Sequence, residues 1–325
     1  MKAVVLDEHG GTEVLQIREI PTPVPKDNEV LVKVHATALN RADILQRKGH
    51  YPGPSTEYEI PGLEFAGTVA KNGTNASRYK EGDVIMGIVA AGSYAEYLTV
   101  HERQVLPVPG EISVVEAAGI PEAWLTAYDA LVDKGKLQRN QKCLIHAGAS
   151  GVGTAAIQIA KKIGSQVAVT ASSAKIEICE KLGADLAIDY HAEDFVERVL
   201  AWTNQEGVQV VIDLVGGDYL ARNLKAVALK GIIVQVGLMG TGKPELDLGT
   251  LLGKRTTLIG TVLRSRTTEE KINLTEEFGA QFLHEFRNKN CTSTIDSVFP
   301  LEDIAEAHTR MEQNKNIGKI IIKIL

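Results

Sequence analysis

The pattern of hydrophobic and polar positions divides this 325-residue chain into three regions. From residue 1 to about residue 109, apolar and polar residues alternate in short runs, which Gly, Pro and Asn turns separate. Alternation with a period of two predicts antiparallel strands with one buried face, as in a β-barrel or a sandwich. A helical pattern interrupts these strands at residues 41–49, and Gly49 ends it.

The second region, from about residue 122 to residue 263, alternates near-continuous apolar runs with amphipathic stretches. Apolar strands that alternate with helices are typical of a parallel sheet covered on both faces, so the predicted fold class is α/β. The tail has a mixed pattern of helices and strands, and we expect it to complete the first domain. The apolar runs predict strands at residues 142–148, 166–171, 186–190, 208–215, 231–238 and 256–263.

The composition argues against several classes of protein and partner. Lys plus Arg is 35 and Asp plus Glu is 41, a formal net charge of −6, which gives no electrostatic support for nucleic acid or an anionic membrane as partner. No apolar run approaches the roughly 20 residues of a membrane helix, and the N-terminus lacks the apolar core of a signal peptide. Cys143, Cys179 and Cys291 form no CxxC pair, so neither a disulfide framework nor a zinc knuckle is indicated. We expect a cytoplasmic protein.

A glycine-rich turn follows the predicted strand at residues 142–148. Gly148, Gly151 and Gly153 would let the backbone turn tightly and approach a pyrophosphate, and the next helix would point its N-terminal amides at the phosphates. The spacing departs from G-x-G-x-x-G, because Ser150 stands at the middle position. Such glycines also occur for packing alone, but the five further strands that alternate with helices favour a dinucleotide site.

The segment after the second strand of this unit lacks the carboxylate that usually binds the adenosine ribose of NAD. Ser172, Ser173 and Lys175 stand there instead. An ammonium and hydroxyls would bind a 2′-phosphate, so NADPH fits better than NADH. Tyr190, which ends the third strand, could offer a second donor. The alternatives are a solvated lysine on a polar loop and a surface tyrosine that covers the sheet edge.

The chain resembles the medium-chain dehydrogenase/reductase superfamily, in its zinc-free quinone oxidoreductase branch, over essentially its whole length. Within that branch it is most similar to the stress-inducible NADPH:quinone oxidoreductases and next to the zeta-crystallins. The segments that carry the resemblance are ALNRADILQRKGHYP, PGLEFAGTV, GDVIMGIV, GSYAEY, AAGIPEAWLTAYDAL, LIHAGASGVGTAAIQIAK, EKLGAD, GLMG, LRSR and EAHTRMEQNKNIGKIII.

The resemblance implies two domains. A GroES-like β-barrel catalytic domain would comprise residues 1–121 and 266–325. A Rossmann domain with a doubly wound parallel sheet would comprise residues 122–265 and bind NADPH. The family also implies that the cofactor lies in the cleft between the domains, and that two Rossmann sheets join at the sixth strand to form a homodimer.

The same resemblance implies three groups of cofactor contacts. The pyrophosphate would meet Ser150, Gly151 and Val152, and the 2′-phosphate would meet Ser173, Lys175 and Tyr190. The nicotinamide would lie among Asn40, Thr126, Leu238, Met239, Gly240, Val262, Leu263, Arg264 and Ser265.

The chain departs from the zinc alcohol dehydrogenases of this superfamily at the ligand positions. Those relatives have an early Cys and a G-H-E motif, whereas this chain has Asn40 in the first place and Leu63 in the place of the His. The four-cysteine structural zinc lobe is also missing. Zinc needs three or four N, S or O ligands that converge, so we expect no metal.

Quinone reduction requires that the protein bind NADPH and orient it against a flat acceptor. It requires little more, because the reduced ring stabilises its own charge. Asn40 could polarise an acceptor carbonyl or fix the nicotinamide, and Tyr51 could stack on the acceptor or hydrogen-bond to it. Tyr51 could equally cover the barrel mouth. Asp43 lies three residues after Asn40; it is a candidate catalytic group, but local capping or a salt bridge with Arg41 or Arg47 is the simpler expectation.

Two histidines have the chemistry of proton donors but fit other roles. His50 lies in a Pro/Gly-rich loop, where a histidine usually faces solvent, and His146 on a strand is expected to be packed.

Two other functions stay open at this stage. The first is NADPH-dependent reduction of activated C=C bonds in enals, enones or enoyl thioesters, which needs a proton donor. Tyr51 is the donor that the sequence offers for that reaction. The second is a non-catalytic NADPH-binding or RNA-binding role, against which the acidic charge balance argues.

Overall fold

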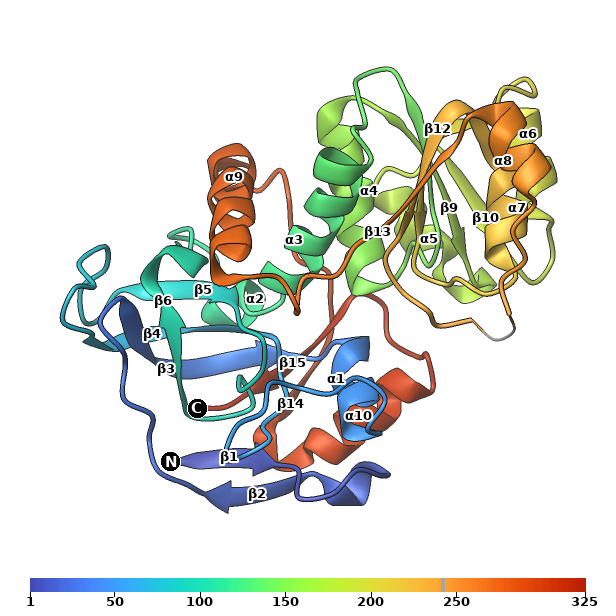
Figure 1. The fold of residues 1–325 in the computed structure, drawn as a ribbon. Coiled ribbons are helices and arrows are strands. Elements are labelled where there is room, and N and C mark those ends of the chain that lie inside the picture. Colours follow the sequence, from blue (N-terminus) through green and yellow to red (C-terminus); the bar gives the residue numbers. More distant parts are fainter. Residues whose placement is uncertain (241–242) are drawn as a thin grey trace. The chain divides into compact units, whose positions relative to one another are not determined.

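The computed structural model describes residues 1–240 and 243–325. The chain forms two compact units (Figure 1). The terminal unit comprises Met1–Leu125 and Leu263–Leu325, and the central unit comprises Thr126–Val262. Among the helices of the described residues, none is both long enough and apolar enough to cross a membrane.

A six-stranded sheet with the order β10-β9-β8-β11-β12-β13 forms the middle of the central unit. All neighbouring strands are parallel. Each strand overlaps an apolar run, which confirms the predicted parallel sheet. The strands are β8 (Lys142–Ile145), β9 (Gln166–Ala171), β10 (Leu186–Asp189), β11 (Val208–Asp213), β12 (Val227–Gln235) and β13 (Thr257–Gly260).

Helices cover both faces of this sheet, with α4 on one side and α6, α7 and α8 on the other (Figure 1). The change of face follows from the strand order, because the chain builds outward from β8 to β10 and then starts again at β11, on the other side of β8. Phe195, Val199 and Leu224 belong to the core under α6 and α7. The helical segments are η3 (Asp129–Lys134, a π-helix), α4 (Gly151–Ile163), η4 (Ser173–Lys175), α5 (Ile176–Lys181), α6 (Phe195–Trp202), α7 (Tyr219–Ala226) and α8 (Leu248–Lys254).

The terminal unit contains a seven-stranded sheet with the order β14-β15-β3-β4-β5-β7, in which β6 also pairs with β3. Every second residue of β3 from Val30 to Val34 is fully buried, which is the predicted period of two. The early strands are antiparallel as expected, whereas β14 and β15 from the tail form a parallel pair. The strands are β1 (Lys2–Val5), β2 (Gln16–Glu19), β3 (Glu29–Ala38), β4 (Glu64–Asn72), β5 (Val84–Ile88), β6 (Tyr97–His101), β7 (Val105–Pro107), β14 (Ile295–Pro300) and β15 (Lys319–Lys323).

The predicted helix at residues 41–49 is α1, and Gly49 follows it with a φ of +74°, a conformation that favours glycine. Helix α10 packs with α1 and β15 in a core that contains Ile44, Met311 and Ile320. The helical segments are η1 (Thr12–Val14), α1 (Arg41–Arg47), η2 (Glu102–Gln104), α2 (Val114–Ala117), α3 (Pro121–Tyr128, which begins in this unit), α9 (Thr268–Arg287), η5 (Leu301–Asp303) and α10 (Ile304–Glu312).

Candidate functional site

The carboxyl ends of the central strands bring most predicted cofactor residues to one edge of the sheet. Gly148 follows β8, residues 172–175 follow β9, Tyr190 follows β10, and residues 238–240 follow β12. The connections from β8 and from β11 run in opposite directions along the sheet, so a switch point lies between these two strands. Parallel α/β sheets bind ligands outside the carboxyl ends of the strands at such a point.

The glycine turn combines a capped helix start with two closely packed glycines. Ser150 is the N-cap of α4, and its hydroxyl accepts a hydrogen bond of 3.0 Å from the backbone N–H of Gly153. A Cβ on Gly153 would lie 2.3 Å from the carbonyl oxygen of Ala147, and one on Gly148 would lie 2.7 Å from the Val169 side chain. Both glycines are therefore required by close packing. The amides of the first turn of α4 lack helical acceptors and fit a pyrophosphate.

The predicted 2′-phosphate residues lie together at the ends of β9 and β10. Ser173 is exposed, Lys175 is partly exposed at the start of α5, and Tyr190 is 44% exposed. The Ser173 hydroxyl donates a hydrogen bond to the Asp189 carboxylate. This bond, followed by a second from the His191 backbone, lowers the pKa of Asp189, which keeps the group ionised.

Asp189 was not among the residues predicted from the sequence. Its signal is the position directly before Tyr190, at the end of β10. Parallel pairing of β10 with β9 aligns Asp189 with Ala171, so the carboxylate meets the segment that follows β9. A negative charge therefore lies inside the cluster that is predicted to hold a phosphate.

The residues of the central unit that are predicted to contact the nicotinamide lie in α3 (Thr126) and in the loops after β12 and β13. Leu238 is 78% exposed and Met239 is 42% exposed. The backbone N–H of Gly240 donates to the carbonyl of Val215 at 2.7 Å, which holds the loop after β12 against the loop after β11. Thr126 is nearly buried, and Val262 is 47% exposed.

Three further predicted cofactor residues belong to the terminal unit. Leu263 is buried and Ser265 is exposed. Arg264 is nearly buried, and its guanidinium donates to Ala90 O (2.8 Å), Tyr51 O (3.1 Å) and Gln46 Oε1 (2.5 Å). These bonds direct the Arg264 charge to the loop that carries Tyr51.

Asn40 lies in a cluster of charged groups within the terminal unit. Its Nδ2 donates to Glu64 Oε1 at 2.9 Å and to Ala38 O at 3.2 Å, and its Oδ1 accepts from Lys319 Nζ at 2.7 Å. Both hydrogens of the side-chain amide are therefore engaged. In this arrangement Asn40 has no further donor with which to polarise a substrate carbonyl, contrary to one of the two roles that the sequence suggested for it.

Lys319 gives this cluster its positive charge. Its ammonium donates to the carbonyl of Leu39 at 2.8 Å and to Asn40, and it lies 2.7 Å from Glu64 Oε1. The side chains of Lys319 and Glu64 are 4% and 0% exposed. Antiparallel pairing of β15 with β3 brings the start of β15 to Asn40. This buried ion pair was not predicted from the sequence.

The residues at the zinc-ligand positions of the metal-dependent relatives do not fit zinc. Leu63 is a buried hydrocarbon side chain, and the Lys319 ammonium contacts Asn40. A cation there would meet a fixed positive charge and too few ligands. Within residues 1–240 and 243–325, no three or more His, Cys, Asp or Glu side chains are grouped so that they could hold a metal ion.

Asp43 is a buried positioning group. One carboxylate oxygen accepts from the backbone N–H of Asn40 at 2.7 Å and from the Tyr94 hydroxyl at 3.1 Å, and the other accepts from the backbone N–H of Gly62 at 3.2 Å. Burial raises the pKa of Asp43 to about 6, and the bond from Asn40 is the largest effect that opposes it. Local capping is thus what the structure shows for Asp43, whereas Arg47 pairs with Glu312.

Tyr51 and Glu122 are the partly exposed acids near this cluster. The Tyr51 ring centre lies 4.9 Å from the Arg264 guanidinium, and burial raises the pKa of the phenol. The backbone N–H of Glu122 donates to Glu64 Oε2 at 2.9 Å. Burial, and then the charge of Glu64, raise the pKa of Glu122 to about 8. Glu122 stands in the quoted segment PEAW, yet its chemistry was not recognised from the sequence.

The histidines behave as predicted. His50 is exposed. His146 is buried between Thr170 Oγ1 at 2.9 Å and Asn223 Oδ1 at 2.7 Å, so both ring nitrogens are satisfied inside the central unit.

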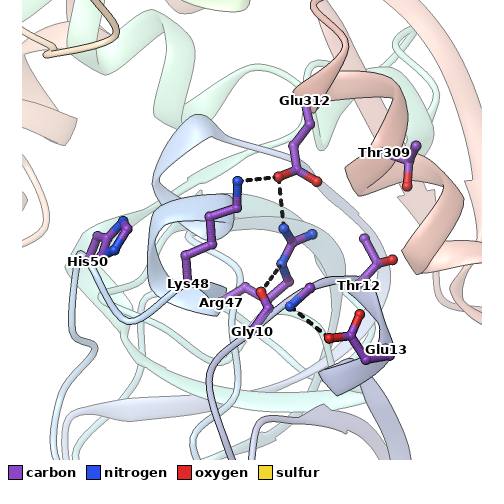
Figure 2. A pocket seen from close by; sticks show the side chains of 9 residues that line it. Gly10, Thr12, Glu13, Arg47, Lys48, His50, Thr309 and Glu312 are labelled. Carbon is purple, nitrogen blue, oxygen red and sulfur yellow. Dashed lines mark hydrogen bonds and ion pairs between the residues drawn. The ribbon is translucent and has the colours of Figure 1, made fainter. Parts of the chain in front are cut away.

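A cavity of about 550 Å³ in the terminal unit lies beside α1 and α10 (Figure 2). The Lys48 and Arg47 side chains both pair with Glu312, at 2.5 Å and 2.9 Å. These ion pairs neutralise the charges that would attract an ionic ligand, and none of the predicted catalytic or cofactor residues lines the cavity. Its lining comprises Gly10, Gly11, Thr12, Glu13, Arg47, Lys48, His50, Thr309 and Glu312.

Comparison with known families matches both units. Residues 26–110 match the alcohol dehydrogenase GroES-like domain, and residues 151–287 match the zinc-binding dehydrogenase family. The quinone oxidoreductase of Homo sapiens is 30% identical over 326 aligned positions, which cover 99% of this chain and 97% of that protein.

Solved structures agree with this fold over the full chain. The Escherichia coli quinone oxidoreductase complexed with NADPH has a TM-score of 0.90 at 29% identity and is covered over 100% of both chains. An NAD-dependent alcohol dehydrogenase has a TM-score of 0.91 at 29% identity, again over 100% of both chains. The CurK enoyl reductase has a TM-score of 0.87 at 27% identity, over 100% of this chain and 99% of the other.

The GroES-like and Rossmann-type folds, the glycine turn at the switch point and the full-length similarity lead to one assignment. The chain belongs to the quinone oxidoreductase family of the medium-chain dehydrogenase/reductase superfamily, and it is an oxidoreductase with a nicotinamide cofactor.

Proposed function

We propose that this protein reduces quinones with NADPH and without zinc. The observation that carries this proposal is the Lys319–Glu64–Asn40 cluster, which puts a buried ammonium beside a position where zinc-dependent relatives hold their metal. An alcohol substrate needs a group that accepts its hydroxyl proton, a task that zinc performs in those relatives. A quinone does not, because its ring accepts hydride and stabilises the resulting phenolate.

The cofactor proposal rests on the carboxyl edge of the central sheet. A bound nicotinamide cofactor would supply the hydride. The glycine turn and the first turn of α4 would hold its pyrophosphate through Ser150, Gly151 and Val152. Ser172, Ser173, Lys175 and Tyr190 would hold the 2′-phosphate, with Lys175 as the main charge.

On the acceptor side, we assign different roles to the three catalytic candidates. Asn40 and Asp43 hold the cluster in place, because their polar atoms bond to protein groups. Tyr51 is the candidate that keeps a partly exposed ring, and the Arg264 guanidinium over that ring fixes its orientation. A flat acceptor would stack on Tyr51 or bond to its hydroxyl.

The direct test compares acceptors under steady-state conditions. NADPH oxidation is followed with 1,2-naphthoquinone, with an alkenal and with a crotonyl thioester, and a chelator is added in parallel. We expect the highest kcat/KM with the quinone and no loss of rate with the chelator. A higher specificity for the alkenal or the thioester would overturn the quinone proposal, and inactivation by the chelator would overturn zinc independence.

Reduction of activated C=C bonds is the second candidate. The similarity to the CurK enoyl reductase and the two acids Tyr51 and Glu122 favour it, because that reaction needs a proton donor. A non-catalytic NADPH-binding or RNA-binding role is the third. Tight NADPH binding by the pure protein with no acceptor reduced would favour this last alternative.

We also propose a cytoplasmic homodimer. Strand β13 is an edge of the central sheet, and Leu258 on it is 40% exposed. An apolar edge strand is usually paired or covered, and a second copy of the chain would cover it. Sedimentation of wild type and Leu258→Lys tests this arrangement: we expect a dimer that the substitution weakens. Cys143, Cys179 and Cys291 are buried thiols, which supports a reducing compartment.

A further inference from the structure

Glu122 differs from the other carboxyl groups near it in the terminal unit. Glu64 and Asp43 are fully buried, and both oxygens of each accept hydrogen bonds. Glu122 is partly exposed. Among the described residues, its carboxyl oxygens have neither a hydrogen bond nor an ion pair. Solvent can therefore reach the Glu122 carboxyl. Transfer of its proton would break no hydrogen bond or ion pair with the described residues.

The position of Glu122 is fixed by its backbone. It lies in the first turn of α3, and its N–H donates to Glu64 Oε2 at 2.9 Å. The other oxygen of Glu64 contacts Lys319 and Asn40. The buried cluster therefore serves as a rigid support for the start of α3, and Glu122 projects from that support.

The groups around Glu122 come from six segments of the terminal unit. Negative charges on Glu64 and Asp43 disfavour its ionisation, whereas the ammonium groups of Lys319 and Lys271 favour it. Tyr51 is close enough for Glu122 to raise the phenol pKa, and Arg264 contacts the Tyr51 ring and is itself influenced by Glu122. Burial is the largest effect on Glu122, and its pKa of about 8 leaves the carboxyl protonated at neutral pH.

We propose that Glu122 is a catalytic acid that donates its carboxyl proton to the acceptor as the acceptor is reduced. This inference rests on the proposed function and deepens it, because it gives the site the donor that the sequence offered only in Tyr51. Tyr51 orients the acceptor beside the carboxyl. The remaining groups of the cluster hold Glu122 in place and keep it protonated.

An acceptor, NADPH and one proton give the reduced acceptor and NADP⁺. Hydride brings two electrons and one hydrogen to the acceptor. The O–H bond of the Glu122 carboxyl breaks, and its proton forms a new O–H bond on a quinone oxygen, or a C–H bond beside the carbonyl of an enone. The Glu122 carboxylate then takes a proton from water.

The pH dependence of Glu122→Gln tests this role in the full-length protein. With 1,2-naphthoquinone, wild-type kcat should fall above about pH 8, because the acid loses its proton. The variant should lose about 10-fold in kcat, below the roughly 10²–10⁴-fold that is usual for an acid catalyst, since a phenolate also accepts protons from water. The kcat of Glu122→Gln should not fall above about pH 8, because the variant has no carboxyl proton to lose at this position. Glu111→Gln, which changes an exposed carboxyl, serves as the control.

A second measurement follows the protonation of the Glu122 carboxyl in the absence of turnover. The infrared carbonyl band of a protonated carboxyl should disappear near pH 8 in the wild-type protein, and this transition should be missing from Glu122→Gln. Asp43 should titrate near pH 6 in both proteins, so the two bands are separable. NADPH affinity, measured by fluorescence, should change less than twofold.

The possible results distinguish a failure of the Glu122 proposal from a failure of the proposed function. Equal kcat and equal pH profiles for wild type and Glu122→Gln, with active quinone reduction, would overturn the role of Glu122 and leave the function intact. A wild-type protein that reduces the alkenal instead, and loses that activity in Glu122→Gln, would overturn the quinone proposal and support Glu122. A wild-type protein that reduces no acceptor contradicts both.

Discussion

The two units place the charges of their candidate sites differently. In the central unit Asp189 and Lys175 are partly exposed and lie beside Tyr190 at the carboxyl edge of a parallel sheet. In the terminal unit the charged pair of the candidate site is buried, with Glu64 at 0% and Lys319 at 4% exposure. Exposed charges change ligand preference at little cost to stability, whereas each member of a buried cluster depends on its partners. Substitutions in the two units should therefore affect different quantities.

The largest effect should come from Lys319→Met. It removes the ammonium that compensates the buried carboxylate of Glu64, and an uncompensated buried charge costs about 3–5 kcal/mol of unfolding free energy. Urea unfolding measures the loss. Lys323→Met is the matched control, because Lys323 lies on the same strand but is exposed.

The double variant Lys319→Met/Glu64→Gln sharpens this prediction. Removal of both charges should recover part of the loss, because the variant no longer buries an unpaired carboxylate. If Lys319→Met is as stable as Lys323→Met, the ion pair does not hold the terminal unit together, and the contrast between the units fails.

The next effect should be a pH dependence of stability. The folded-state pKa of Glu122 is about 8, above the ordinary value of 4.5. Between these values the folded protein binds more protons than the unfolded chain, so its free energy of unfolding falls as the pH rises, by at most about 1.4 kcal/mol per pH unit from this group. Glu122→Gln should have a shallower slope in urea unfolding across this window. Identical slopes would contradict the raised pKa.

The contrast between the units also explains what the sequence predicted and what it did not. The sheet of the central unit follows from apolar runs, and the glycine turn follows from local spacing, so both were predicted. The ion pair of Lys319 with Glu64 depends on the pairing of β15 with β3, which joins the two ends of the chain. Periodicity carries no information about such a pairing. The signals were a lysine at the start of an apolar strand and a glutamate in the segment PGLEFAG.

Asp189 was missed for a related reason. Its contact with Ser173 depends on the alignment of β10 with β9, and the segment after each strand, taken separately, does not reveal that alignment.

In the central unit, Lys175→Ala should change cofactor affinity and leave stability nearly unchanged. We expect NADPH to bind more weakly by roughly 1–3 kcal/mol, the range for one charge-assisted hydrogen bond, and NADH affinity to stay the same. Isothermal titration with both cofactors measures this. Lys181→Ala, on the exposed side of α5, is the control. Equal weakening of both cofactors would show that Lys175 does not contact the 2′-phosphate.

The smallest effect should come from Asp189→Asn. The partly exposed carboxylate repels a 2′-phosphate held by Ser173 and Lys175, so its neutralisation should tighten NADPH by roughly two- to fivefold, the scale of a surface charge pair. The gain should shrink as salt is added, because ions screen exposed charges. NADH affinity should not rise, and Asp218→Asn, an exposed carboxylate elsewhere in the central unit, should change neither cofactor. Weaker NADPH binding by Asp189→Asn would mean that the carboxylate serves the site by orienting the Ser173 hydroxyl, and that this orientation outweighs the repulsion.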